Sequence, residues 1–300
     1  MTVVLNETLS LMLFAFVGYL LAKLKLVKSE HTAILSALEV YVFCPCLAFN
    51  TFSKNCTRQT ISEKMPFIVA AFAILAVIIA VAYVITRSCW RDPFLRNIYH
   101  YALVVPNYGY MGYALALSIY GETALLNAMI FCLPINLYTY TVAFPLITGS
   151  GKVSPRKMLN PSNVAICLGC IVGLLAIPLP DIISSSVSKA GACMSPVSMI
   201  LTGIVLSEFP VLKLIRNKSA IFISVLRLIV IPVAVILITK QFFSTDVAVI
   251  AGLICAMPCG LNTIVFPRLV GRDCEPGAAM AFISNIMALV TVPAILALFF

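Results

Sequence analysis

The residues with the clearest chemical signal lie in two polar stretches inside apolar sequence. Residues 103–121 read LVVPNYGYMGYALALSIYG, and residues 256–265 read AMPCGLNTIV. Proline removes a backbone donor and clashes with the preceding helical turn, and glycine permits non-helical backbone, so we predict that both segments break. A break creates helix N-termini, whose partial positive charge and unpaired N–H groups suit an anion such as a carboxylate. The candidate binding residues of the two breaks are Pro106, Asn107, Tyr108, Gly109, Tyr110, Pro258, Cys259, Gly260 and Asn262.

Several side chains at these breaks allow two interpretations. The amide of Asn107 could donate hydrogen bonds to a carboxylate, or it could only cap the second half-helix. Tyr108 and Tyr110 could line a pocket or bond a loose carbonyl group. Asn262 is included because its position mirrors that of Asn107. The residues that kink two further apolar segments, and could line the same pocket, are Pro45, Ser195 and Pro196.

Two charged residues fall inside apolar segments, where charge is expensive and usually functional. Glu39 is the best candidate for carrying a coupled proton, and the alternative is a buried ion pair with Arg227 or Lys189. Arg227 could attract substrate carboxylates, or its guanidinium could bond carbonyl groups freed by the second break. We favour the structural role for Arg227. No cofactor is expected, and coupling to H⁺ or Na⁺ is left open.

The chain as a whole is too apolar for a soluble fold. Of its 300 residues, 62% are hydrophobic and 10% are charged, and the mean hydropathy is +1.07. This composition predicts an all-α integral membrane protein. Windows of the roughly 20 apolar residues that a membrane span needs occur at 8–25, 32–52, 66–86, 98–119, 123–147, 162–179, 187–207, 219–239, 247–267 and 277–299.

The net charge of +9 is best explained by orientation in a membrane rather than by nucleic-acid binding. Fourteen of the twenty Lys and Arg residues fall in loops on one side of the predicted spans. Because basic loops stay in the cytoplasm, we expect a multi-pass protein with both termini outside. The expected location is the plasma membrane, or the bacterial inner membrane if the source is prokaryotic.

The sequence offers no clear enzyme site. It has no phosphate-binding loop, no zinc-ligand spacing outside the predicted spans and no soluble domain, so we expect neither an enzyme nor an ATP-driven pump. We interpret its eleven cysteines, including Cys44 and Cys46, as small packing residues rather than as a metal or disulfide site.

Landmarks that recur at a nearly constant offset predict an internal repeat. The matching pairs are Gly18 with Gly169 and Pro45 with Pro196, both 151 residues apart, and Pro106 with Pro258, 152 apart. Each half then holds five spans, and this odd number turns the second half upside down, with broken fourth and ninth helices crossing near the midplane. The predicted units are a first five-helix repeat (1–147), a cytoplasmic connector (148–160) and a second, inverted repeat (161–300).

Over essentially its whole length the chain resembles the auxin efflux carrier family. The resemblance rests on PNYGYMG at 106–112, on the Met-Pro with Gly and Asn at 257–262, on LRLIVIP at 226–232 and on LNPSN at 159–163. The long central loop of the plant carriers is missing, so the chain is more similar to short bacterial-type members, which include malonate and malate carriers. The resemblance implies a scaffold of spans one, two, six and seven, a transport domain that moves against it like an elevator, and a substrate held near Asn107.

These observations predict a secondary transporter of a small organic anion, a mono- or dicarboxylate, that works in a lipid bilayer by alternating access. We expect no nucleic-acid partner, and a homodimer is left open. One alternative is a sensor with a transporter fold that binds a ligand without moving it. Another is a cation antiporter, which would require paired aspartates that both breaks lack.

Overall fold

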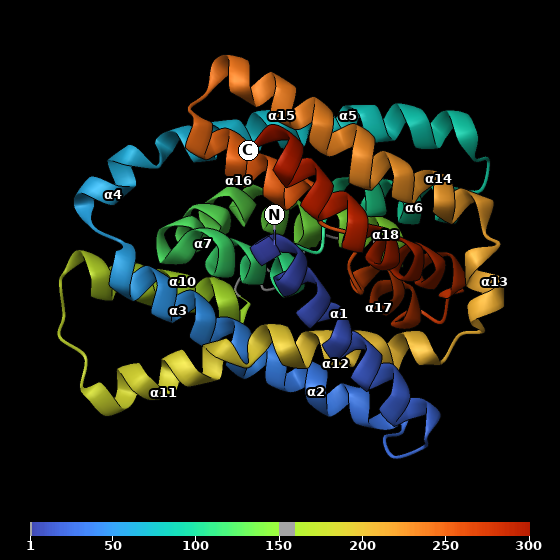
Figure 1. Ribbon diagram of the computed structural model, residues 1–300, viewed down its shortest axis with the longest axis horizontal. Helices are drawn as coiled ribbons and strands as arrows, with labels where there is room; N and C mark the ends of the chain where they lie inside the picture. Colours follow the sequence, from blue (N-terminus) through green and yellow to red (C-terminus); the bar gives the residue numbers. More distant parts are fainter. Residues whose placement is uncertain (1, 150–159) are drawn as a thin grey trace.

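The chain folds into helices that pack around the two breaks (Figure 1). The computed structural model describes residues 2–149 and 160–300. Within these ranges there is no strand, and one isolated antiparallel bridge joins Pro106 to Cys259. The predicted connector, 148–160, lies mostly outside the described residues.

The first half of the described chain contains α1 (Thr2–Lys23), η1 (Ser29–His31), α2 (Thr32–Leu38), η2 (Glu39–Phe43), α3 (Cys44–Asn55), α4 (Arg58–Glu63), α5 (Met65–Cys89), α6 (Pro93–Val104), η3 (Tyr108–Gly112), α7 (Tyr113–Tyr138), η4 (Thr139–Ala143) and α8 (Phe144–Thr148). The second half contains α10 (Pro161–Leu174), α11 (Asp181–Ala192), α12 (Met194–Ser207), α13 (Val211–Ile215), α14 (Lys218–Val225), η5 (Leu226–Val230), α15 (Ile231–Phe242), α16 (Thr245–Cys255), α17 (Asn262–Arg268) and α18 (Glu275–Phe299).

Seven helical runs in the described chain are long and apolar enough to cross a membrane. One of them, Tyr108–Thr148, is 41 residues long and turns at Gly121, whose φ of 83° is not helical. Two shorter apolar helices, α10 and α16, overlap the predicted windows 162–179 and 247–267. The prediction of an all-α integral membrane protein is confirmed, whereas ten spans in two inverted repeats remain a prediction.

Wider π-helical turns precede proline in three of the membrane-spanning runs. The turns η2, η4 and η5 come directly before Cys44-Pro45, Phe144-Pro145 and Ile231-Pro232. Because proline cannot donate to the preceding turn and its ring crowds a carbonyl there, a wider turn relieves the clash without ending the helix. Both charges that the sequence places inside the membrane, Glu39 and Arg227, lie in such turns.

Glycine allows two helix pairs to approach very closely. α1 packs on α12, and α3 packs on α10. A Cβ atom on Gly18 would lie 2.0 Å from the carbonyl oxygen of Ile200, and one on Gly169 would lie 2.9 Å from that of Phe49. Such small-residue contacts are the usual way in which membrane helices pack. The other long helices form a second group, in which α5 packs on α6 and α7, α15 on α16, and α14 on α18.

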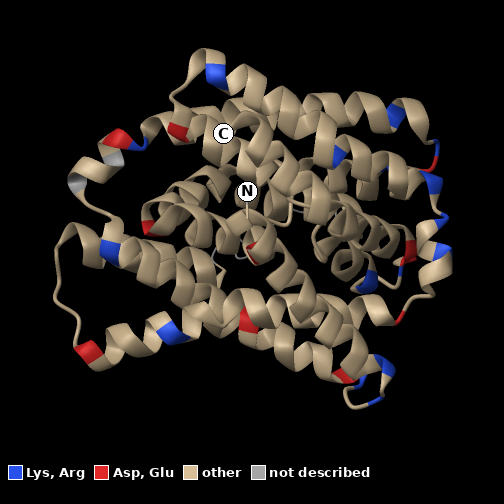
Figure 2. Cartoon of the chain, viewed as in Figure 1, with Lys and Arg blue, Asp and Glu red and all other residues tan. Residues whose placement is uncertain are grey.

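Charged residues lie mainly at the ends of the helices. Figure 2 shows Lys and Arg gathered along the right-hand edge of the view, around α13 and the start of α14 and beyond the end of α1. Three ion pairs tie neighbouring elements together, and they join Lys54 to Glu122, Lys213 to Glu275 and Glu208 to Arg268.

Candidate binding site at the two helix breaks

The two breaks lie directly against each other. α6 and α16 both end before their prolines, and the next helical segments begin at Tyr108 and Asn262. The backbone N–H of Asn107 donates to the carbonyl oxygen of Pro258 at 2.8 Å. The chain therefore breaks where the prolines predict, and backbone groups freed by one break are satisfied by the other, as a membrane interior requires.

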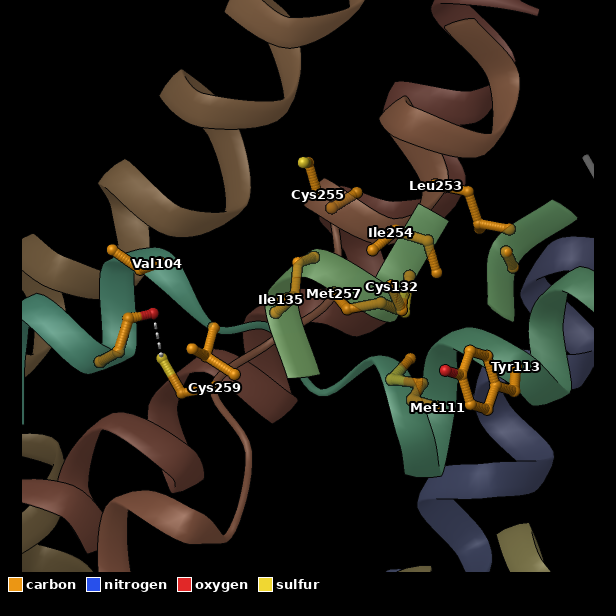
Figure 3. Close-up of a cluster of buried hydrophobic side chains, with 14 of the residues drawn as sticks. Val104, Met111, Tyr113, Cys132, Ile135, Leu253, Ile254, Cys255, Met257 and Cys259 are labelled. Carbon is orange, nitrogen blue, oxygen red and sulfur yellow. Dashed lines mark hydrogen bonds between the residues drawn. The ribbon is translucent and has the colours of Figure 1, made fainter. Parts of the chain in front are cut away.

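Apolar side chains pack closely around the breaks, as the close-up in Figure 3 shows. Ile254 and Met257 are fully buried, and they face Gly112, on which a Cβ atom would lie 3.1 Å and 3.3 Å from their side chains. The thiol of Cys259 points back toward α6 and contacts the carbonyl oxygen of Ala102 at 3.9 Å. This packing keeps water away from the joined backbone segments.

Arg227 holds the C-terminal ends of both half-helices. Its guanidinium is fully buried, and it donates to the carbonyl oxygens of Leu103 at 2.7 Å and Met257 at 3.2 Å. Both carbonyl groups lie just before a proline that ends helical hydrogen bonding. A cation is stabilised at a helix C-terminus by the helix dipole, so Arg227 serves two such ends at once. The structure thus agrees with the structural interpretation of Arg227, and it does not place this side chain in the cavity described next.

A cavity of about 200 Å³ opens at the breaks. Eight of the candidate residues line it, namely Glu39, Pro106, Asn107, Tyr108, Gly109, Tyr110, Gly260 and Asn262. The described lining contains no Lys, Arg or His, and Glu39 is its one ionisable carboxyl group. Polar tyrosine and asparagine groups therefore share the site with a single acid.

Asn107 lines the cavity and does not cap the helix that follows it. Its side chain is 5% exposed and makes no capping bond to the helix that begins at Tyr108. The backbone carbonyl of Asn107 accepts from the N–H groups of Met111 and Gly112 at 3.3 Å and 3.2 Å, which already anchors the helix start. Gly260 lies beside this amide, and a Cβ atom there would be at an ordinary contact distance of 3.9 Å from Oδ1 of Asn107. The amide is available to the cavity.

Asn262 approaches the same cavity from the other break. It is the first residue of α17, where no side chain caps the helix, and its amide lies beside the hydroxyl of Tyr101. The two asparagines thus line one cavity from different halves of the chain.

Glu39 is buried and unpaired. Its side chain is 2% exposed, and neither carboxyl oxygen has a hydrogen-bond partner within the described chain. The hydroxyl groups of Tyr110 and Ser198 face it without bonding geometry. Neither Arg227 nor Lys189 pairs with Glu39, so the alternative of a buried ion pair is wrong.

Five other candidates lie close to the cavity without lining it. Pro258 and Cys259 are buried in the backbone contact between the breaks. The other three, Pro45, Ser195 and Pro196, follow the lining residues Cys44 and Met194 in sequence. Successive helical residues point about 100° apart. Cys44 and Met194 therefore line the cavity in place of Pro45, Ser195 and Pro196.

Sequence reasoning missed several polar groups of the lining, namely Tyr101, Tyr113, Asn136, Tyr140 and Ser162. Ser162 lies in the LNPSN motif that contributes to the family resemblance, and its hydroxyl contacts the Cys44 thiol at 3.1 Å. The Oδ1 atom of Asn136 is buried without a partner in the described chain. The only sequence signal for these residues was a polar group inside an apolar helix.

Comparison with known proteins places the chain among transporters. The model of a family described as membrane transport proteins matches residues 3–154 and 150–296. An uncharacterized transporter of Methanocaldococcus jannaschii is 25% identical over 306 residues, covering 96% of each chain. A Rhizobium meliloti protein named provisionally as a malonate transporter is 24% identical, covering 94% of this chain and 91% of its own length. An uncharacterized transporter of Methanothermobacter thermautotrophicus is 23% identical, with 96% of each chain covered.

Proposed function

This chain belongs to the membrane transport protein family, the auxin efflux carrier-like family that its sequence resembles, and we propose that it carries a small organic anion across the membrane as a secondary transporter. The observation that carries the proposal is the cavity at the joined breaks, with the amides of Asn107 and Asn262 in its lining. The first residues of the helix that begins at Tyr108 line this cavity, and the first N–H groups of a helix have no intrahelical partner. A carboxylate is the ligand that such donors suit.

The size of the cavity favours a small substrate. Its 200 Å³ is below the roughly 300–1,000 Å³ of pockets that hold drug-sized ligands. The provisional name of the Rhizobium meliloti relative, a malonate transporter, supports a carboxylate of this size. We propose a mono- or dicarboxylate.

We further propose that the halves are inverted repeats with ten spans. Two close contacts support this arrangement, because both obey the offset of 151 residues. Gly18 packs on Ile200, and Gly169 packs on Phe49. Gly169 is the repeat equivalent of Gly18, and Ile200 is the repeat equivalent of Phe49, so each contact joins a residue of one half to a residue of the other, with the two halves exchanged. A two-fold axis in the membrane plane produces this exchange.

The packing also supports an elevator motion. The glycine-lined pairs α1–α12 and α3–α10 would form the scaffold, and the group that carries both breaks would form the moving part. The cavity lies between these groups, because Glu39 and Met194 come from the first, and Asn107 and Asn262 come from the second. Movement of one group against the other would then expose the substrate to alternate sides. The gathering of basic residues at one end (Figure 2) supports an orientation with that end in the cytoplasm and both termini outside.

Replacing Asn107 with alanine tests the site. Purified Asn107→Ala should fold like the parent and bind carboxylates at least roughly tenfold more weakly, because a buried donor to a charged group contributes about 1.5–3 kcal/mol. The matched control is Asn97→Ala on the exposed part of α6, where the amide bonds the carbonyl of Leu146. Equal carboxylate binding by parent and Asn107→Ala would refute the assignment.

Transport itself is tested by counterflow of a labelled carboxylate in proteoliposomes. A secondary transporter exchanges internal for external substrate without any added energy source. Binding without counterflow would instead indicate a sensor with a transporter fold.

A further inference from the structure

The cavity at the breaks combines an anion-binding end with a buried acid that nothing neutralises. Glu39 is 2% exposed, both of its carboxyl oxygens lack a partner, and it lines the same cavity as Asn107. A charged carboxylate that is buried without a partner is strongly unfavourable. Binding a second, uncompensated anion beside it would increase this cost.

Within residues 2–149 and 160–300, the elements around Glu39 supply no positive charge. From η3, Tyr110 presents a hydroxyl, and from α12, Ser198 presents another. The hydroxyl of Ser198 is already committed, because it donates to the carbonyl oxygen of Met194 at 2.6 Å. On its own run of helix the neighbouring titratable group is the thiol of Cys44. Whatever neutralises Glu39 must therefore enter the cavity from outside.

A second orphaned acceptor lines the same cavity. The Oδ1 atom of Asn136 is buried without a partner, while the Nδ2 atom of this residue is directed to Asn163 at 3.4 Å. The cavity thus holds three buried acceptor atoms without a hydrogen-bond partner in the described chain: two on Glu39 and one on Asn136. A simple carboxylate brings no donor to any of them.

We propose that the substrate is an α-amino carboxylate, whose carboxylate is held at the Asn107 end and whose ammonium group is held by Glu39. An ammonium group carries three N–H donors and one positive charge, which matches a carboxylate and a nearby amide oxygen. A zwitterion leaves the number of uncompensated charges in the cavity unchanged, whereas a monocarboxylate adds one and a dicarboxylate adds two. The volume of about 200 Å³, far above the roughly 10–15 Å³ that one water molecule needs, leaves room for a small molecule such as an amino acid. This inference rests on the carboxylate site of the proposed function, and it replaces a simple mono- or dicarboxylate with a carboxylate that also carries an ammonium group.

The test is a binding panel on the purified full-length protein. The probes are alanine, leucine and phenylalanine, each with its deaminated analogue (propionate, 4-methylpentanoate and 3-phenylpropionate) and its decarboxylated analogue (ethylamine, isopentylamine and phenethylamine). Binding is measured as a ligand-induced rise in melting temperature, because a ligand that binds the folded form stabilises it. At least one amino acid should bind roughly tenfold more tightly than both of its analogues.

Two variants show which group provides the discrimination. Glu39→Gln removes the charge at nearly constant volume, and the preference for the amino acid over its deaminated analogue should fall by roughly tenfold or more. Glu122→Gln, at an exposed acid that pairs with Lys54 outside the cavity, should leave that preference unchanged. Because Glu39→Gln relieves a buried charge, it should melt no lower than the parent, so its binding can be compared directly.

Three results would overturn the proposal. The first is deaminated analogues that bind the parent as tightly as every amino acid of the panel. The second is binding of propionate that appears only with Na⁺ present, which would assign the positive charge to a free cation. The third is binding of propionate that strengthens at low pH in the parent and is independent of pH in Glu39→Gln, which would assign a proton to Glu39. In each case, comparison with Asn107→Ala separates the two proposals. If Asn107→Ala still weakens binding, the carboxylate site stands and only the amino-acid proposal fails. If Asn107→Ala binds like the parent, the carboxylate site is refuted as well.

Discussion

Replacing Arg227 with methionine should destabilise the protein, because Arg227 bonds the carbonyl groups of Leu103 and Met257 at the ends of two half-helices. Methionine fills similar volume and leaves both buried acceptors without a partner. Each buried acceptor left unpaired costs about 1–3 kcal/mol, so two cost about 2–6 kcal/mol. Removal of a buried charge offsets part of this loss, and we expect a net loss near the lower end of that range.

The single tryptophan provides a suitable assay. The indole of Trp90 donates to Ser219 at 3.2 Å and packs on Phe222, both in the helix that leads into η5, so its fluorescence reports on the docking of the run that carries Arg227. A loss of about 2 kcal/mol should lower the melting temperature by roughly 4–8 °C. Arg227→Lys should fall between the parent and Arg227→Met, because an ammonium group lacks the planar fork that reaches two carbonyls. Arg87→Met, at an exposed position that contacts Tyr83, is the control.

Local opening should accompany the thermal effect. Cys255 and Cys259 are 2% and 1% exposed and lie close to the guanidinium. In Arg227→Met their alkylation, located by mass spectrometry, should be faster than in the parent. A variant that melts within about 2 °C of the parent, keeps both thiols protected and loses carboxylate binding would refute our reasoning, because Arg227 would then be a substrate ligand.

Two further predictions concern the proposed motion and the helix packing. The ion pair of Glu208 with Arg268, 2.6 Å apart, joins the end of α12 to α17, so it must break if these groups move. Glu208→Gln should change the initial counterflow rate by up to roughly fivefold, the effect of about 1 kcal/mol. Lys213→Met breaks a pair with Glu275 inside the other group, so it should leave the counterflow rate unchanged. Equal effects of the two variants on this rate would contradict an elevator. Gly203→Ala would place a methyl carbon 1.8 Å from a carbonyl oxygen of α1, so α1 and α12 must separate. The melting temperature should then fall by at least several degrees. An unchanged melting temperature would show that this contact is not tight.

The sequence predicted the breaks because their cause is local. Pro106 and Pro258 disrupt a helix wherever it packs, and the glycines beside them are readable in the same stretch of sequence. The sequence also placed Glu39 and Arg227 inside apolar runs. It could not tell that Arg227 would bond two carbonyl groups while Glu39 has no bond in the described chain, because the acceptors of Arg227 lie 124 and 30 residues away in the chain.

The lining of the cavity was harder to predict because it depends on the orientation of helices around their axes. Asn136 and Tyr140 come from a helix whose polar residues are too few to mark a face, and they reach the cavity only because that helix follows the turn at Gly121. Pro45 and Pro196 were expected to line the cavity because they kink helices toward it. A π-helical turn before Pro45 shifts the register of the side chains, so Glu39 and Cys44 face the cavity instead.

The two buried charges lie in the same kind of local structure but in opposite environments. Each lies in a wider turn that precedes a proline. Arg227 faces the C-terminal ends of α6 and α16, where two carbonyl groups and the negative ends of two helix dipoles stabilise it, while its Nη2 atom has no partner in the described chain. Glu39 faces the cavity at the N-terminal side of the next helix, where no group of the described chain satisfies it. Arg227 therefore occupies the C-terminal, negative ends of the half-helices, whereas the N-terminal, positive end and Glu39 both face the cavity. The proposed substrate, which carries a carboxylate and an ammonium group, would interact with both.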